Sequence, residues 1–303
     1  MERPVSEIAG TAATPWGRWW YAPMPTARIA VMRAIVYLFV PIDVLFLTNS
    51  AVVHAYLPAD LYRPVLMARL LHIPAPVPWA METLRVVLIV GSLIAATGRL
   101  RRLAGGVVAV GYLPWVLISM SYGKVDHDHL ALVVALIVLP TAGRARFRDP
   151  DGSEAAGWTI QSIRIAVVSA YFLSAWAKMR WGGWGWANGE TLEWALVRRG
   201  TLIGRDIADQ RWLLHASQWV TLVAETASPL LLFTRGRLQL AGIVFFLGFH
   251  LTTEILMSIH FMPQVICLVA AFTPWERLIE SARSRKVSAE PAAPAAPSTD
   301  SAT

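Results

Sequence analysis

Long apolar runs separated by short polar segments dominate the chain. The runs at 81–98, 103–120 and 238–249 carry few charged side chains. A large soluble core could hold three or four such runs but not eight, whereas a bilayer accepts one apolar helix of about 20 residues for each crossing. The pattern therefore predicts an all-α, polytopic membrane bundle of about eight transmembrane helices. The predicted spans are 27–48, 81–98, 103–122, 129–143, 159–179, 218–234, 238–259 and 261–275.

Basic residues gather between the apolar runs. The chain has 303 residues, of which 55% are hydrophobic, and a formal net charge of +7. It has no zinc-finger, RNP-like or basic-helix pattern, so the charge indicates membrane topology and excludes nucleic acid as a partner. Short cytoplasmic loops attract Lys and Arg, which predicts a multi-pass protein of the cell membrane with both termini cytoplasmic. The clusters are Arg99/Arg101/Arg102, Arg144/Arg146/Arg148, Arg235/Arg237 and Arg283/Arg285/Lys286.

The sequence predicts three regions. Residues 1–26 form an N-terminal cytoplasmic segment, 27–278 the transmembrane domain, and 279–303 a disordered cytoplasmic tail rich in Ala, Pro and Ser. The longest outer loop is 180–217, and the tryptophans in and beside it are expected at the headgroup level of the outer leaflet. These are Trp181, Trp184, Trp186, Trp194, Trp212 and Trp219.

Ionisable residues inside spans are costly in lipid and usually face the interior of the bundle. Tyr171, Ser174 and Lys178 lie three, four and seven residues apart, so they share one face of a helix. Lys178 either snorkels to the headgroups or lies in a dry cavity, where desolvation favours the uncharged amine and makes it a usable base. The ionisable residues in the spans are Arg33, Asp43, Lys178, Glu225, His250 and Glu254.

Histidines supply a second set of candidates. His250 and Glu254 are one turn apart, so His250 is either a satisfied core residue or a functional group whose tautomer the carboxylate fixes. The loop 126–129 reads Asp-His-Asp-His, which is compatible with a metal site. Alternate residues of an extended loop point apart, however, and Asp126 or Asp128 is expected to cap the fourth span. We therefore assign no metal ligand.

The predicted topology brings protonatable groups from several helices to one depth. Lys178, His127, His129 and His260 all lie at the outer boundary, and His250 approaches them from within the bilayer. This convergence predicts a pocket that opens to the outer side.

Two segments resemble a known family. The first is YFLSAWAKM, from Tyr171 to Met179, followed by Trp184 and Gly189. The second is FLGFH, from Phe246 to His250, continuing to Ser258-Ile259-His260-Phe261. With His127, Arg33 and Asp43, they resemble the motifs of the vitamin K-dependent gamma-carboxylase-like membrane proteins, whose common core is the HTTM domain. The resemblance covers residues 20–278.

The resemblance implies a role for each candidate. In the gamma-carboxylases the matching lysine deprotonates vitamin K hydroquinone, which reacts with oxygen to give an epoxide and a strong base that allows carbon dioxide to add to peptidyl glutamate. Carried over, Lys178 is the base and His250 and His127 share its catalytic pocket. The quinol, of vitamin K or menaquinol type, is expected against Tyr171, Ser174, Glu254, His260 and Phe261.

Departures from the family pattern favour quinol or small-lipid chemistry over peptidyl-glutamate carboxylation. Ala177 replaces a second lysine, and Glu254 stands where a neutral polar residue is expected. The alternative is a non-catalytic membrane protein, either a small-solute carrier or a quinone-binding partner. We assign the bilayer and a hydrophobic quinone as partners; the sequence does not identify a protein partner. Replacing Lys178 by Ala is predicted to leave folding intact and to abolish quinol-dependent oxygen uptake.

Overall fold

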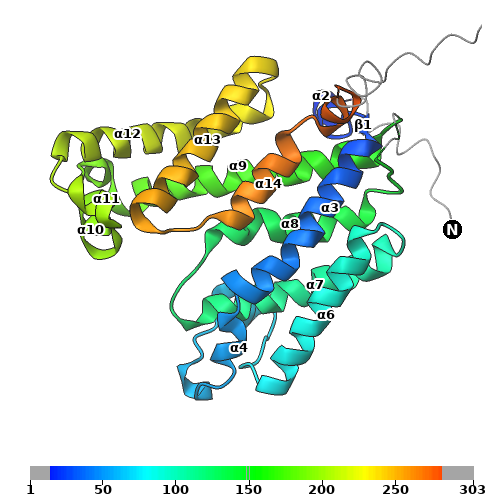
Figure 1. Cartoon of the computed structure of the whole chain (residues 1–303), viewed down its shortest axis with the longest axis horizontal. Helices are drawn as coiled ribbons and strands as arrows, with labels where there is room; N and C mark the ends of the chain where they lie inside the picture. Colours follow the sequence, from blue (N-terminus) through cyan, green and yellow to red (C-terminus); the bar gives the residue numbers. More distant parts are fainter. Residues whose placement is uncertain (1–13, 148, 150, 282–303) are drawn as a thin grey trace, which may run out of the picture.

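The computed structural model describes residues 14–147, 149 and 151–281, which form a helical bundle (Figure 1). The α-helices are α2 (Pro15–Trp20), α3 (Thr26–Ile42), α4 (Ser50–His54), α5 (Leu66–Leu70), α6 (Pro78–Ala96), α7 (Arg101–Ser119), α8 (Leu130–Val138), α9 (Glu154–Gly182), α10 (Glu190–Arg199), α11 (Leu202–Asp206), α12 (Arg211–Ala227), α13 (Gly236–Met257) and α14 (Met262–Phe272). Shorter helical turns are η1 (Asp43–Leu47, a π-helix), η2 (Ala59–Leu61), η3 (Met120–Tyr122), η4 (His127–His129), η5 (Leu139–Thr141), η6 (Trp184–Ala187) and η7 (Ser228–Leu232). Strands β1 (Met24–Pro25) and β2 (Gly152–Ser153) form one antiparallel pair.

Five helices are long and apolar enough to cross a membrane, and they coincide with five of the eight predicted spans. They are Thr26–Leu47, Pro78–Ala96, Arg101–Tyr122, Glu154–Gly182 and Gly236–Met257. Two more predicted spans coincide with the shorter apolar helices His127–Thr141 and Met262–Phe272. The remaining one, 218–234, falls on α12 and η7, where helix α12 is amphipathic. The eight predicted stretches are therefore helical, but not all have the length of a full crossing.

Helix α9 runs through the middle of the bundle, with α8, α12 and α14 packed against it, and α3 packs mainly against α6 and α14 (Figure 1). Together with α6 and α7 these helices bury one large apolar core. Helices α6 and α13 keep most of their apolar side chains exposed in the protein alone, as expected of helices that face lipid. Two small separate apolar clusters lie outside this core. One joins the C-terminal part of α9 to η6 and α12, and the other joins α10, α12, α13 and the residues just after α11.

Helix α3 changes its geometry at Pro41. A proline inside a helix removes one backbone hydrogen bond, and the chain continues as the π-helix η1 from Asp43 to Leu47. Thr48 ends this segment by donating its backbone N–H to the carbonyl of Asp43 at 2.8 Å. The π-turn thereby places the side chains of Asp43 and Thr48 in contact, inside the bundle.

The region 180–217, expected as a loop, is largely helical. It contains η6, α10, α11 and the start of α12. Gly204 allows α11 to touch α13, because a Cβ at this position would lie 2.1 Å from the carbonyl oxygen of Leu256. Five tryptophans in and beside this region are largely or partly exposed, whereas Trp186 packs inward.

The ends of the chain are described in part. Of the predicted N-terminal segment, 14–26 contain α2, β1 and the first residue of α3. Of the predicted tail, 279–281 belong to a helical stretch that begins at 275, and 282–303 lie outside the described residues.

Candidate functional site

A cavity of about 210 Å³ lies where α9, α12, α13, α14 and η4 meet. It brings together six of the residues singled out from the sequence: His127, Tyr171, Ser174, Lys178, His250 and Phe261. Five further residues complete the lining: Asp128, Ala170, Glu225, Phe249 and Gln264. Glu254 and His260, which the sequence placed at the same site, do not line it.

Helix α9 provides one wall of the cavity. Its N-cap is Ser153, whose side chain accepts a hydrogen bond from the N–H of Ala156, and its C-cap is Gly183, which has a positive φ of 58°. Tyr171, Ser174 and Lys178 follow one another along a single face of this helix and all line the cavity. The predicted polar stripe is therefore present, and its amine lies near the end of the helix.

Lys178 is paired with a carboxylate. Its Nζ donates hydrogen bonds to both carboxylate oxygens of Glu225 on α12. The side chain of Lys178 is 20% exposed and that of Glu225 only 5%. The ring of Trp186 covers the amine from another side, with its centroid 5.0 Å from Nζ. The sequence left open whether Lys178 reaches the headgroups or lies in a dry cavity. In the structure its amine lies on the cavity wall, in a largely buried ion pair with Glu225.

His250 interacts with Tyr171 and not with Glu254. Its Nε2 lies 2.7 Å from the hydroxyl of Tyr171, and its Nδ1 is buried without a hydrogen-bond partner among the described residues. The ring of Phe261 packs against it at a centroid distance of 5.0 Å. The expected contact with Glu254 is wrong, because that carboxylate accepts from Nδ1 of His260 at 2.5 Å, outside the cavity.

His127 enters the cavity from η4. Its ring packs against Phe261 at a centroid distance of 6.1 Å, so Phe261 contacts both histidine rings. The predicted carboxylate cap is wrong: neither Asp126 nor Asp128 makes a side-chain cap bond, and Asp126 instead pairs with Lys124 at 2.7 Å. Across the part of the chain that the structure describes, no group of three or more His, Cys, Asp or Glu could hold a metal ion.

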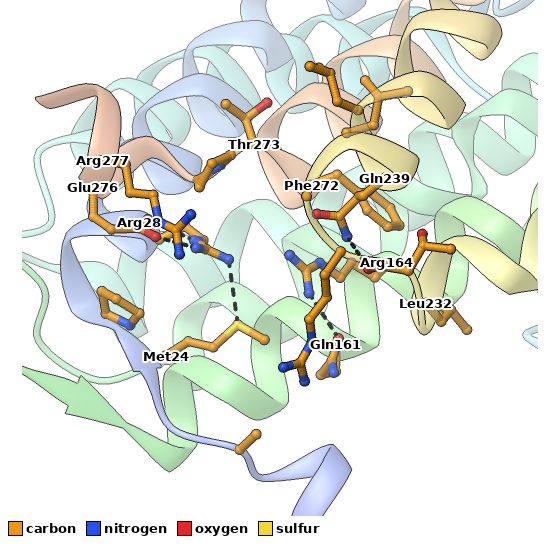
Figure 2. A pocket seen from close by; sticks show the side chains of 18 of the residues that line it. Met24, Arg28, Gln161, Arg164, Leu232, Gln239, Phe272, Thr273, Glu276 and Arg277 are labelled. Carbon is orange, nitrogen blue, oxygen red and sulfur yellow. Dashed lines mark hydrogen bonds and ion pairs between the residues drawn. The ribbon is translucent and has the colours of Figure 1, made fainter. Parts of the chain in front are cut away.

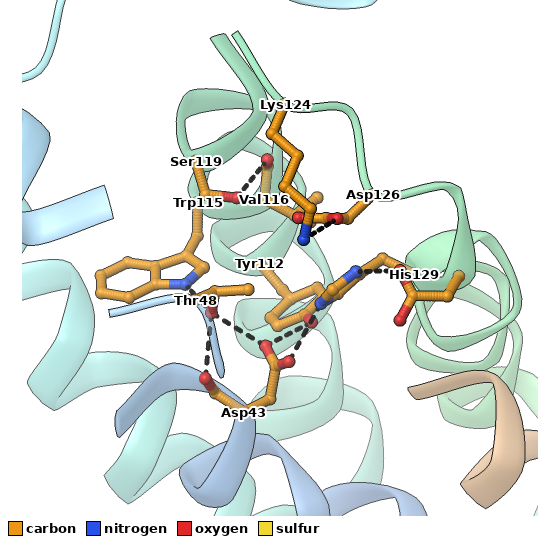
Figure 3. Close-up of polar contacts among 10 residues, drawn as sticks. Asp43, Thr48, Tyr112, Trp115, Val116, Ser119, Lys124, Asp126 and His129 are labelled. Atoms are coloured by element: carbon orange, nitrogen blue, oxygen red, sulfur yellow. Dashed lines mark hydrogen bonds and ion pairs between the residues drawn. The ribbon is translucent and has the colours of Figure 1, made fainter. Parts of the chain in front are cut away.

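A second polar cluster lies beside the cavity and shares Asp128 with its lining. Figure 3 shows the polar contacts of this cluster. We call it the Asp43 cluster; its members are Asp43, Thr48, Tyr112, Trp115, Asp128 and His129. The carboxylate of Asp43 accepts hydrogen bonds from the hydroxyls of Tyr112 at 2.6 Å and Thr48 at 3.0 Å. It also lies 3.0 Å from Nε2 of His129. The indole N–H of Trp115 donates to the hydroxyl of Thr48 at 2.7 Å.

Asp128 connects the two sites. One of its carboxylate oxygens lies 3.2 Å from Nδ1 of His129, and the residue also lines the cavity. His129 therefore has a carboxylate oxygen at each ring nitrogen, an arrangement that favours the doubly protonated imidazolium. Arg33, the other charge in the first span, donates to the carbonyl of Ala145 at 3.0 Å.

Sequence reasoning missed Glu225 as a site residue. Glu225 had been noted only as a charge inside a span, although a buried acid and a buried amine in neighbouring spans usually pair. That rule was the available signal for the ion pair. No comparable signal marked Asp128 or Gln264, whose approach to the cavity depends on how η4 and α14 pack.

Comparison with known proteins gives one match. The sequence model of a family described as HTTM domain matches residues 21–274, which is most of the chain. No curated protein and no solved structure matches it significantly.

Proposed function

The chain belongs to the HTTM-domain family of gamma-carboxylase-like membrane proteins, and on this premise we propose that it is a membrane enzyme in which the Lys178–Glu225 pair takes a proton from a hydrophobic quinol. The observation that carries the proposal is the position of this pair on the wall of a cavity with two histidines and several aromatic rings. Ionisable groups of this kind inside a membrane bundle usually serve function.

The cavity suits the head group of a quinol. At about 210 Å³ it is smaller than the roughly 300–1,000 Å³ of pockets that enclose drug-sized ligands. It would therefore take an aromatic head group and leave an isoprenoid tail in the lipid. The rings of Tyr171, Phe249 and Phe261 offer faces for stacking. The unpartnered Nδ1 of His250 supplies a hydrogen-bonding atom that the protein leaves unused.

In the proposed reaction Glu225 accepts a proton from Lys178. In the charged pair Lys178 already carries its full set of protons, so it can accept another only if it releases one. Its Nζ donates to both oxygens of Glu225, so a proton can pass to the carboxylate while Nζ takes one from a ligand hydroxyl. The pair then holds one more proton, and the remaining ammonium faces the deprotonated oxygen. A bound quinol would supply the electrons for a reaction with oxygen.

The basic loops support a cytoplasmic location for the N-terminal end of α3. The side chain of Arg33 reaches the carbonyl of Ala145, and a Cβ on Gly98 would collide with its guanidinium. The basic clusters at 99–102 and 144–146 therefore flank the same end of the bundle. Under the positive-inside rule this end faces the cytoplasm and the Lys178 cavity faces the opposite side of the cell membrane.

Oxygen uptake by the purified protein tests the proposal. We expect consumption of oxygen with reduced menaquinone or vitamin K hydroquinone, and a fall to background in a variant with both Lys178→Met and Glu225→Gln. The double variant removes both charges, so neither is left buried without a partner. Lys124→Ala is the matched control, because this lysine is largely exposed and pairs only with Asp126. Quinone binding without oxygen uptake would instead favour the non-catalytic quinone-binding protein.

The single variant Glu225→Gln separates the two members of the pair. The amide keeps a hydrogen bond to Lys178 but cannot store the extra proton, so kcat should fall roughly ten- to hundred-fold with little change in KM. Full activity in this variant would show that Lys178 does not need the Glu225 carboxylate as its proton acceptor.

A further inference from the structure

A larger cavity lies at the opposite ends of the helices that form the Lys178 site (Figure 2). Its volume is about 840 Å³, and it is bounded by β1 and the start of α3, the first turns of α9 and α13, and the chain just after α14. Lys178 and Arg164 are both on α9, fourteen residues apart, which is roughly 21 Å along a helix. The two cavities therefore face opposite sides of the membrane.

Arginines dominate the charge of this cavity, which we call the arginine cavity. Five arginines line it, Arg18, Arg28, Arg164, Arg235 and Arg277, against a single acidic residue, Glu276, among the described residues of its lining. Arg28 and Glu276 form an ion pair. Burial raises the pKa of Glu276, but the hydrogen bonds from Arg28 outweigh this effect and leave that pKa below its ordinary value. Glu276 is therefore ionised and offsets one arginine only.

Among the four arginines that do not pair with Glu276, Arg164 is the buried one. Its residue is only 8% exposed, and its partners are neutral: Nε donates to the carbonyl of Ala271 at 3.0 Å, and Nη1 to the amide oxygen of Gln161 at 3.4 Å. The guanidinium also lies over the ring of Phe272, 5.1 Å from its centroid. A buried charge without an opposite charge is costly, and an anion in the cavity would compensate it.

The cavity also has an apolar side. Leu240 and Ile243 of α13 belong to its lining, and Leu240 is 60% exposed on a helix whose apolar residues face outward. The arginine cavity therefore adjoins both the basic loops and the surface where acyl chains would run. Basic pockets between helices on the cytoplasmic side are suited to the head groups of anionic lipids, and guanidinium groups bind phosphate in a bidentate manner.

We propose that the arginine cavity binds the phosphate head group of an anionic phospholipid, with the acyl chains lying along α13. Arg164 is the fixed ligand at the base of the cavity, and Arg18, Arg235 and Arg277 are exposed arginines that close around the head group. This site is independent of the quinol chemistry, since it is built from the other ends of the helices.

Native mass spectrometry of the purified full chain tests the assignment. The protein is incubated with phosphatidylglycerol or with phosphatidylcholine of the same acyl chains, and retained lipid is counted. We expect selective retention of phosphatidylglycerol, weakened on the order of ten-fold or more by Arg235→Gln with Arg277→Gln. These two arginines are exposed, so their replacement should not disturb folding, unlike Arg164→Gln.

Two controls distinguish the outcomes. Arg99→Gln with Arg144→Gln removes the same charge from exposed positions on the same side, outside the cavity, and should leave lipid retention unchanged. The proposal would be overturned if this control lost as much phosphatidylglycerol as the Arg235→Gln/Arg277→Gln variant. Equal retention of the two lipids by the unmodified protein would also overturn it. Inorganic phosphate is added in a separate arm; if it raises the thermal unfolding midpoint as strongly as phosphatidylglycerol, the cavity is a site for soluble phosphate and not for a lipid.

Discussion

Asp43 and Lys178 are both charged residues in predicted membrane spans, and their surroundings differ in kind. Asp43 is fully buried, with hydroxyl groups of two residues and an imidazole around its carboxylate (Figure 3). Lys178 has one acidic partner, remains partly exposed and borders a cavity. The hydrogen bonds of the Asp43 carboxylate are therefore all made within the protein. At Lys178 the cavity leaves room for a ligand beside an amine that can transfer a proton.

The difference separates a stabilising site from a reactive one. A closed network of charged and polar groups joins η1, α7 and η4, and it fixes how these segments pack. An ion pair that opens into a cavity contributes less to packing, because one side of it has no protein neighbour. We therefore expect substitutions in the Asp43 cluster to lower stability, and substitutions at the Lys178 cavity to lower activity.

The largest effect is expected from Asp43→Ala. It leaves the imidazolium of His129 with only Asp128 and removes the acceptor of the Tyr112 hydroxyl, whereas the Thr48 hydroxyl keeps the backbone carbonyl of residue 43. Breaking a buried pair costs about 3–5 kcal/mol. Most of the protein should then be lost from the monodisperse peak in size-exclusion chromatography. Asp60→Ala, at an exposed acid, is the control and should behave as wild type. A stable Asp43→Ala protein that lacks only activity would place the Asp43 cluster in the reaction.

Removing the Lys178–Glu225 pair should have the next largest effect. Lys178→Met with Glu225→Gln is expected to lower quinol-dependent oxygen uptake by about 10²–10⁴-fold, the usual contribution of a general base. The thermal unfolding midpoint in detergent should change far less than in Asp43→Ala. A large drop in that midpoint with normal specific activity would reverse the roles assigned to the two regions.

The same tyrosine-to-phenylalanine substitution in each region sharpens the contrast. Tyr112→Phe removes a hydrogen bond to the Asp43 carboxylate and should cost about 1.5–3 kcal/mol of stability without changing kcat/KM. Tyr171→Phe removes a neutral hydrogen bond to His250 and should cost only about 0.5–1.5 kcal/mol, while weakening quinol binding several-fold. The unfolding midpoint and KM are measured on both variants. A larger loss of stability in Tyr171→Phe, with weaker quinol binding in Tyr112→Phe, would contradict the comparison.

The smallest effect is expected from Glu254→Gln. This carboxylate pairs with His260 where both side chains are about half exposed, and such surface pairs contribute about 0–1 kcal/mol. Neither stability nor oxygen uptake should change measurably. A loss of activity in this variant would indicate that Glu254 acts on His250, as the sequence suggested and the structure does not show.

The expectation for Lys178→Ala changes with the structure. From the sequence, the variant should fold normally, because no partner of the lysine had been identified. The ion pair means that this variant leaves Glu225 buried alone, unless the carboxylate takes up a proton. The double variant is therefore the cleaner test of chemistry.

Several features could be predicted because they depend on residues close together in the chain. The period of Tyr171, Ser174 and Lys178 fixes a shared helical face, and the structure lines the cavity with all three. The membrane class follows from the length of the apolar runs, and the family motifs selected Lys178, His250 and His127 as one site. The lengths of the shorter helices and the helical structure of 180–217 did not follow, because hydropathy does not report where a helix ends.

What the sequence determined by itself is that the protein lies in a membrane, where its long apolar helices run along the chain, and that Tyr171, Ser174 and Lys178 share one helical face. Tertiary structure alone decided the partners: Glu225 for Lys178, His129 for Asp43, Tyr171 for His250 and His260 for Glu254. The reason is geometric. Contacts between helices depend on the rotation and tilt of each helix about its neighbours, and a rotation by a fraction of a turn exchanges one partner for another without altering the hydropathy of either helix.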